Sequence, residues 1–204
     1  CQSVLPMVAS GETILSWAFT ETDPRMTPQS VQAPAVADGD DFVINGAKLF
    51  VDNFSVADQC LVVCRTAAAS AANDGLSLFL VDCDSPGISH RDLVTLAKDN
   101  HSEVTFSDVR VPGSRLIGDL NEGAPIAENL IELATALLCA QMLGATRKDM
   151  EMAVEWSKYR KAFGQPIGAF QSLQHMCADM LMWADGGDLL TFEALWKLDQ
   201  GLQA

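Results

Sequence analysis

The hydrophobic pattern of this chain changes once, at Gly123, and that change constrains the fold more than any other feature. Before Gly123 the apolar runs are short and strand-like. After it, apolar residues recur at spacings of three and four, first from Leu130 to Val154 and then from Leu173 to Leu198, as in amphipathic helices. The sequence therefore predicts a β domain followed by two long helices.

Several apolar runs of strand length precede Gly123, among them residues 59–65, 77–82 and 103–111. Two further runs, residues 42–44 and 48–51, flank the dipeptide Asn45-Gly46. We expect a two-residue hairpin turn at this dipeptide, because both residues tolerate positive φ. Residues 67–74 are mostly small, and we expect them to form a mobile loop.

Two antiparallel helices leave much of their apolar stripes uncovered, so this pair must pack against more helix. The longest mostly apolar stretch, residues 130–145, contains Glu132 and Gln141. It falls short of the roughly 20 apolar residues that a bilayer span needs, so we predict no membrane insertion.

The composition is that of a soluble globular protein, because 49% of the 204 residues are hydrophobic and 20% are charged. The net charge of −14 argues against nucleic acid and anionic membrane surfaces as partners. No secretion signal is recognisable, which favours a cytoplasmic location. The six cysteines and three histidines show no metal-ligand spacing, so we predict no metal site.

Five sequence blocks carry the strongest functional signal, and they are residues 17–21 (WAFTE), 41–53 (DFVINGAKLFVDN), 106–112 (FSDVRVP), the pair Gly118 and Gly123, and residues 159–171 (YRKAFGQPIGAFQ). In this order they resemble the motifs of acyl-CoA dehydrogenases, flavoenzymes that desaturate acyl thioesters. The resemblance implies an α+β fold with an antiparallel, barrel-like or sandwich-like middle domain followed by long antiparallel helices of a C-terminal bundle. The implied domains are the end of an N-terminal helical domain (1–11), the middle domain (12–118) and a partial bundle (119–204).

The resemblance also implies an activity, namely proton abstraction from an acyl-CoA and hydride transfer to flavin N5. The implied cofactor is FAD, and the implied partners are an acyl-CoA substrate and an electron-transfer acceptor protein. Fatty acid metabolism and a homo-oligomeric dimer or tetramer are further expectations.

Five residues are implied to contact the isoalloxazine ring. By the family pattern Phe19 and Thr20 lie against it, while Phe50, Val51 and Asp52 flank its other parts. Asp52 replaces a residue that is commonly Thr, and a carboxylate there would disfavour an anionic reduced flavin. Alternatively, Asp52 caps the turn at residues 52–53, and the sequence leaves both interpretations open.

The other half of FAD is implied to bind near the second helix. Arg160 would bind the pyrophosphate of FAD in a neighbouring subunit, because a planar guanidinium suits a diphosphate, and Phe163 and Gln171 would lie near the adenosine. Without the family context, Arg160 would be interpreted first as an ordinary exposed arginine of a helix. Arg25 and Met26 stand where the family has Gly-Ser; Met26 is a candidate substrate contact, and Arg25 either obstructs close backbone approach or supplies a charge to a phosphate.

The catalytic base is unknown. The family's usual Glu lies in a part of the bundle beyond Ala204, and the less common position holds Ala134. Glu132 is about 200° around the helix from Ala134, so it faces elsewhere. His90, His101 and His175 have no carboxylate or cysteine at triad-like or ligand spacing.

Three functional hypotheses follow from these features. The first is part of an FAD-dependent acyl-CoA dehydrogenase, a fragment that is inactive alone. The second is a non-catalytic structural or binding subunit of a hetero-oligomeric dehydrogenase, assembled with a paralogue. The third is a flavin-dependent oxidase or monooxygenase of the same fold.

Overall fold

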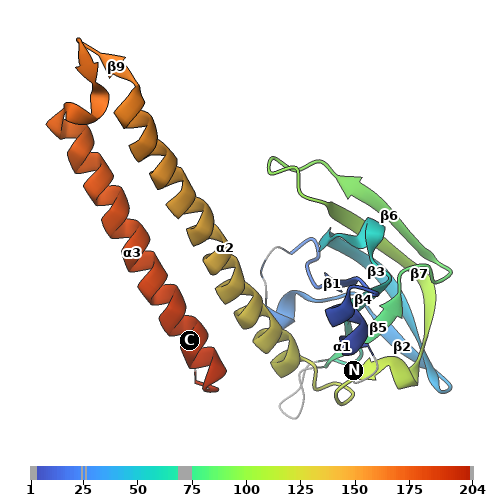
Figure 1. Cartoon of the computed structure of the whole chain (residues 1–204). Coiled ribbons are helices and arrows are strands. Elements are labelled where there is room, and N and C mark those ends of the chain that lie inside the picture. Colours follow the sequence, from blue (N-terminus) through green and yellow to red (C-terminus); the bar gives the residue numbers. More distant parts are fainter. Residues whose placement is uncertain (1–3, 24, 26, 69–74, 203–204) are drawn as a thin grey trace. The chain divides into compact units, whose positions relative to one another are not determined.

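The computed structural model of the chain describes residues 4–23, 25, 27–68 and 75–202, and it contains two compact units, Cys1–Asn129 and Leu130–Ala204 (Figure 1). Most of the predicted mobile loop, residues 69–74, lies outside the described residues. The predicted domain limits after residues 11 and 118 stay a prediction.

The first unit contains the short α-helix α1 (Leu5–Ser10), the start of a long helix that continues into the second unit, and two four-stranded sheets. One sheet has the order β1 (Leu15–Ala18), β4 (Gln59–Arg65), β5 (Leu76–Asp82) and β8 (Leu116–Ile117). The other has the order β2 (Ala35–Asp38), β3 (Asp41–Asp52), β7 (His101–Pro112) and β6 (Ile88–Leu93). All neighbouring strands are antiparallel except β1 and β4, which are parallel.

The core of this unit is formed by side chains of both sheets. Val62 and Phe79 from one sheet and Ile44, Val104 and Phe106 from the other belong to one buried cluster. Strand β5 is buried at every position from Leu76 to Val81, which explains its nearly continuous apolar sequence. The strands predicted at residues 59–65, 77–82 and 103–111 are confirmed.

The predicted hairpin turn at Asn45-Gly46 is wrong. Strand β3 runs through this dipeptide, and its pairing with β7 shifts register there, as in a β-bulge. The Asn45 side chain is paired with Asp108 of β7, donating from Nδ2 to Oδ1 over 3.0 Å and accepting the Asp108 amide over 2.9 Å. The turn into β3 lies instead at Gly39-Asp40, where Gly39 has a φ of 66°.

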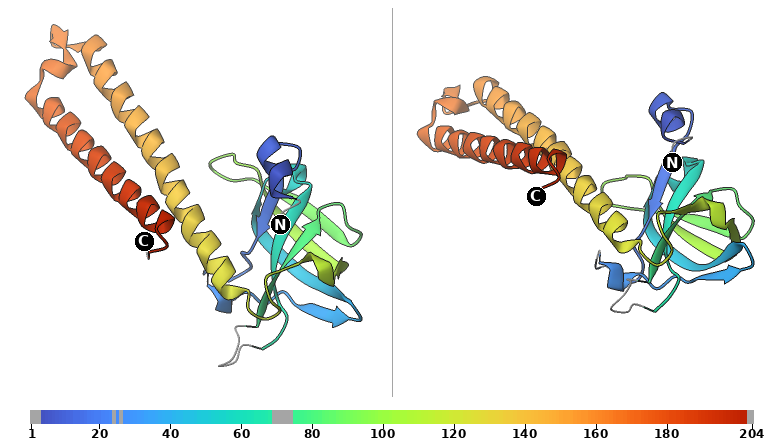
Figure 2. Two further views of the ribbon diagram at one scale, coloured as in Figure 1. Left: turned by 60° about the horizontal axis from the view of Figure 1, so that its bottom comes forward. Right: turned by 90° about the horizontal axis from the view of Figure 1, so that it is seen from below.

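The second unit is a helical hairpin. Helix α2 (Ala124–Tyr159) and helix α3 (Gln171–Asp199) lie side by side in both views of Figure 2, and strands β9 (Lys161–Ala162) and β10 (Gln165–Pro166) form the connection. Arg147 of α2 holds the helices together, donating to Asp185 over 2.8 Å and also to Asp188. These elements, with the largely antiparallel sheets, confirm the predicted α+β class.

The helices of the second unit expose much of their apolar surface. Leu137, Met142, Trp183 and Leu189 each have more than half of their surface exposed. Helix α2 is also long and apolar enough to cross a membrane by length and composition, contrary to the length estimate from residues 130–145. Core helices of helical bundles share this length and composition. The exposed apolar stripe is what a helix pair presents to further helices.

Candidate functional site

The first group of predicted site residues lies where the chain leaves β1. Trp17 and Phe19 stack with their ring centroids 5.7 Å apart, and Phe19 is buried. The next residue, Thr20, is partly exposed, and its carbonyl oxygen accepts a hydrogen bond of 2.8 Å from the Leu49 amide of β3. The loop after β1 is therefore held directly against β3.

The second part of this group is an irregularity in β3. Pairing with β7 shifts between Lys48 and Val51, so the two residues between them are displaced from the ladder. Phe50 has a φ of 53° and is 54% exposed, whereas Val51 is fully buried. Bulges of this kind re-aim side chains and are common next to active sites. Here the irregularity places an aromatic ring at the surface, one residue from the contact with Thr20.

Asp52 has a partner that neither interpretation of the sequence included. Its Oδ1 lies 3.0 Å from Nδ1 of His101, which faces it across the β3–β7 ladder. The other ring nitrogen of His101 lies 3.0 Å from the Asp99 carboxylate. Hydrogen bonding from Thr95, and less so the proximity of His101, lowers the pKa of Asp99. His101 thus has two carboxylate neighbours. One of them, Asp99, lies only two residues earlier in the sequence and was overlooked when the histidine spacing was considered.

Glu21 and Lys48 are the main residues that sequence reasoning overlooked at this site. Lys48 Nζ lies 2.8 Å from Glu21 Oε1, with the Lys48 side chain fully buried and that of Glu21 11% exposed. Lys48 also donates to the carbonyl oxygen of Phe19 over 3.1 Å. The signal was present in the sequence, because Lys48 has the same strand parity as the buried Ile44 and so points inward.

The loop that follows Glu21 is described only in part. Arg25 donates from Nε to the Asp23 carboxylate over 3.0 Å, and this contact lowers the pKa of Asp23. The guanidinium is therefore paired within its own loop. Met26 lies outside the described residues, and its role as a substrate contact stays a prediction.

The predicted adenosine and pyrophosphate residues lie in the connection of the second unit. Residues Phe163 and Gly164 form the two-residue turn between β9 and β10, with φ values of 53° and 83°. Phe163 is 94% exposed and meets Phe170 edge-on, with centroids 6.1 Å apart. Arg160 and Gln171 are exposed at the two ends of this connection. All three predicted residues thus lie on one short segment.

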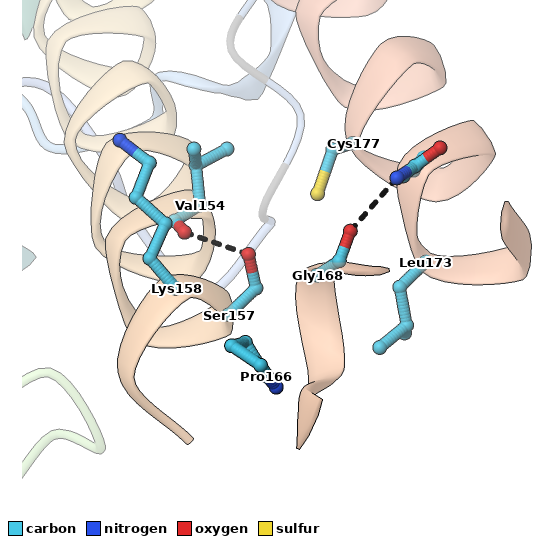
Figure 3. Close-up of a pocket in the computed structure, with 8 residues that line it drawn as sticks. Val154, Ser157, Lys158, Pro166, Gly168, Leu173 and Cys177 are labelled. Atoms are coloured by element: carbon cyan, nitrogen blue, oxygen red, sulfur yellow. Dashed lines mark hydrogen bonds between the residues drawn. The ribbon is translucent and has the colours of Figure 1, made fainter. Parts of the chain in front are cut away.

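A pocket of about 490 Å³ lies beside the same connection (Figure 3). It is mainly apolar, and its lining includes Val154, Ser157, Lys158, Pro166, Leu173 and Cys177. Two hydrogen bonds frame it, from Ser157 Oγ to the Val154 carbonyl (2.7 Å) and from Gln174 Nε2 to the Gly168 carbonyl (2.9 Å). Its volume is in the range of small-molecule sites.

The eight predicted cofactor residues thus fall into two groups. Five lie in the first unit, around the junction of the β1 loop with the irregular part of β3, and three lie on the connection between α2 and α3. Among the described residues, no cluster of three or more His, Cys, Asp or Glu side chains could hold a metal ion.

Comparison with known proteins matches both units. The family described as "Acyl-CoA dehydrogenase, middle domain" matches residues 16–109, and "Acyl-CoA dehydrogenase, C-terminal domain" matches residues 121–204. This chain belongs to the acyl-CoA dehydrogenase family. The resemblance stated from the sequence motifs is confirmed.

Three relatives define the extent of the similarity. The probable acyl-CoA dehydrogenase YngJ of Bacillus subtilis is 30% identical over 201 residues, which are 97% of this chain and 53% of that protein. The solved structure of butyryl-CoA dehydrogenase from Megasphaera elsdenii has a TM-score of 0.90 at 27% identity and covers 98% of this chain. The structure of PigA with FAD and proline has a TM-score of 0.90 at 28% identity and covers 99% of this chain. In both structures the match covers 53% of the other chain, so the present chain spans about half the length of its relatives.

Proposed function

We propose that this chain forms part of an FAD-dependent acyl-CoA dehydrogenase and supplies both halves of its flavin site. The observation that carries the proposal is the bond from the Leu49 amide to the Thr20 carbonyl, because it joins the two segments assigned to the isoalloxazine ring. The PigA structure, with FAD bound and a TM-score of 0.90, supports FAD as the cofactor.

The residues at this junction fit a flavin chemically. Thr20 offers a hydroxyl and a backbone amide at a partly exposed position, suited to the polar pyrimidine edge of the ring. Phe50 offers an exposed aromatic surface, and the buried Phe19 and Val51 make the support rigid. When bound, FAD would accept a hydride from the β-carbon of the acyl thioester. The residues named here bind and orient the cofactor.

The connection between α2 and α3 fits the other half of the cofactor. Arg160 would pair with the diphosphate through its planar guanidinium, and Phe163 and Gln171 would contact the adenosine. We assign this contribution to FAD held by a neighbouring subunit, so the functional protein would be at least a homodimer and, by family analogy, a tetramer. The apolar pocket beside the connection would accept part of the same ligand.

For the whole protein we also propose a substrate, an oxidant of the reduced flavin, a metabolic role and a location. The substrate would be an acyl-CoA, the oxidant of the reduced flavin an electron-transfer protein, the metabolic role fatty acid oxidation and the location the cytoplasm. The catalytic base is not assigned among these 204 residues.

The proposal is tested on the protein as its gene encodes it. Wild-type protein should purify with FAD absorbance and reduce an artificial electron acceptor with at least one member of a broad acyl-CoA panel. Arg160→Ala should weaken FAD binding by about tenfold or more. Lys161→Ala removes a positive charge from the next residue and should leave FAD affinity nearly unchanged. A wild-type protein that binds no FAD at micromolar concentration contradicts the proposal.

A second candidate is a non-catalytic subunit of a hetero-oligomeric dehydrogenase. The pairing of Arg25 with Asp23 favours it, because this ion pair lies where the family has small residues that approach the ligand. FAD binding without turnover of any acyl-CoA, together with co-purification of a paralogous chain that restores turnover, would select this candidate.

A further inference from the structure

Lys48 is the only charged residue among those described whose side chain is completely buried. Removing an ammonium group from water is costly unless it is paired and hydrogen-bonded. An apolar residue at this inward position of β3 would have avoided that cost. The presence of Lys48 therefore requires a reason other than packing.

The partners of Lys48 form a network across three segments. The ammonium contacts the Glu21 carboxylate at 2.8 Å and the Phe19 carbonyl oxygen at 3.1 Å. Glu21 in turn accepts the backbone amides of Gln32, at 2.9 Å, and Ala33, at 3.0 Å. The loop after β1 is thereby anchored both to β3 and to the segment that precedes β2.

This network fixes the direction of one peptide plane. In a trans peptide the carbonyl of one residue and the N–H of the next point in opposite directions. Because Lys48 holds the Phe19 carbonyl, the Thr20 N–H must point away from the buried ammonium. The next carbonyl, that of Thr20, is held by the amide of Leu49, so two consecutive residues of β3 fix two consecutive peptide groups of the loop.

We propose that Lys48 and Glu21 are positioning residues of the flavin site, which set the orientation of the Thr20 amide and hydroxyl toward the isoalloxazine. This inference rests on the proposed function. A merely structural ion pair could be replaced by neutral residues without effect on the ligand. A positioning pair cannot, because a side chain at residue 48 that presents no donor to the Phe19 carbonyl leaves that carbonyl free to rotate.

The test measures the effect of the substitutions on stability separately from their effect on flavin binding. Lys48→Met leaves the Glu21 carboxylate buried without its cation, so the apoprotein should be less stable. The double variant Lys48→Met/Glu21→Gln removes both charges and keeps an acceptor for a backbone amide, so it should regain at least half of the lost melting temperature. FAD affinity of the double variant, measured by fluorescence titration of apoprotein, should stay weaker than wild type by about tenfold or more. The visible absorption band of its bound flavin should also be altered.

The matched control is an ion pair in the other part of the same sheet. Arg110 of β7 and Asp41 of β3 pair over 3.2 Å at the end of the ladder remote from Lys48, with 55% and 34% of their side-chain surfaces exposed. Arg110→Met/Asp41→Asn should change neither FAD affinity nor the absorption band. If Lys48→Met and the double variant do not fold, Lys48→Gln, whose shorter side chain withdraws the donor from the Phe19 carbonyl, carries the same affinity and absorption measurements.

Two results overturn the inference. FAD affinity that returns to within about threefold of wild type as stability returns would make the pair structural only. A wild-type protein that binds no FAD would remove the proposed function and the inference with it. The first of these results, obtained with wild-type protein that binds FAD, would remove the inference alone.

Discussion

The Phe50 ring stands edge-on to the imidazole of His101, with centroids 6.1 Å apart and an interplanar angle of 87°. This contact braces a side chain whose backbone is strained, because Phe50 has a φ of 53°. A bulky residue in the left-handed region costs of order 1–2 kcal/mol, and such strain concentrates at functional sites. A substitution at Phe50 that relieves the backbone strain should therefore maintain or raise stability and at the same time weaken flavin binding.

The first prediction concerns Phe50→Asn. Asn tolerates positive φ, so the substitution should leave the free energy of unfolding of the apoprotein within about 1 kcal/mol of wild type or raise it. Loss of the exposed ring should weaken FAD binding several-fold. Urea unfolding and FAD titration of the same preparations measure both quantities.

Val56→Asn is the control for this prediction. Val56 lies six residues further along and is 56% exposed, close to the 54% of Phe50, but it has no positive φ. It should leave FAD affinity unchanged. Equal losses of affinity in the two variants would show that the Phe50 ring has no special role.

Much of the first unit could be predicted because its strands carry their own apolar patterns. The Asn45-Gly46 hairpin was mispredicted for a physical reason. The same dipeptide that accepts a two-residue turn also fits a continuous strand opposite a bulge in β7. That outcome depends on a partner 63 residues away, Asp108, which pairs with the Asn45 side chain. The local propensities of Asn45 and Gly46 carry no information about a contact so distant in sequence.

The candidate site shows the same limit. The motifs identified Thr20 and Phe50, yet the bond that joins their segments is made by the backbone of Leu49, whose side chain type is irrelevant to it. The buried pair of Glu21 and Lys48 looked polar and therefore exposed in sequence. Only the strand parity of Lys48 indicated otherwise.

The second prediction compares two glycines of the helical unit. An added Cβ would meet nothing within 4 Å at either Gly164 or Gly144. The effects of the two Gly→Ala substitutions on stability therefore differ only through the backbone conformation. Gly164 has a φ of 83°, and Gly164→Ala should destabilise by about 1 kcal/mol. Gly144 lies within α2, and Gly144→Ala should stabilise by about 0.5–1 kcal/mol. Denaturant unfolding that gives the same sign for both would contradict the assigned turn.

The third prediction concerns the contact between α2 and α3. Arg147 bonds both Asp185 and Asp188, and its side chain is 35% exposed. Arg147→Met should lower the free energy of unfolding only modestly, since partly exposed pairs contribute little each. Lys148→Met removes the neighbouring, 69% exposed cation and should have a smaller effect. Thermal unfolding of the two variants under identical conditions measures the difference.

The fourth prediction is a pH dependence that originates in the core. Burial raises the pKa of the Cys64 thiol from 9.0 to about 12, and it also raises that of Cys60. Above pH 9 the unfolded chain therefore releases protons that the folded chain keeps. The unfolded state then binds fewer protons, so stability must fall as pH rises from 9 toward 12.

Each buried thiol should contribute a slope of up to about 1.4 kcal/mol per pH unit in this range. Cys64→Ala should reduce the slope of stability against pH above pH 9 by the contribution of one thiol, whatever its effect on stability at neutral pH. Val63→Ala, at the adjacent buried position of β4, should lower stability at every pH and leave the slope unchanged. Urea unfolding at a series of pH values from 7 to 10.5 separates the two. An unchanged slope in Cys64→Ala would mean that Cys64 ionises in the folded protein as readily as in the unfolded chain.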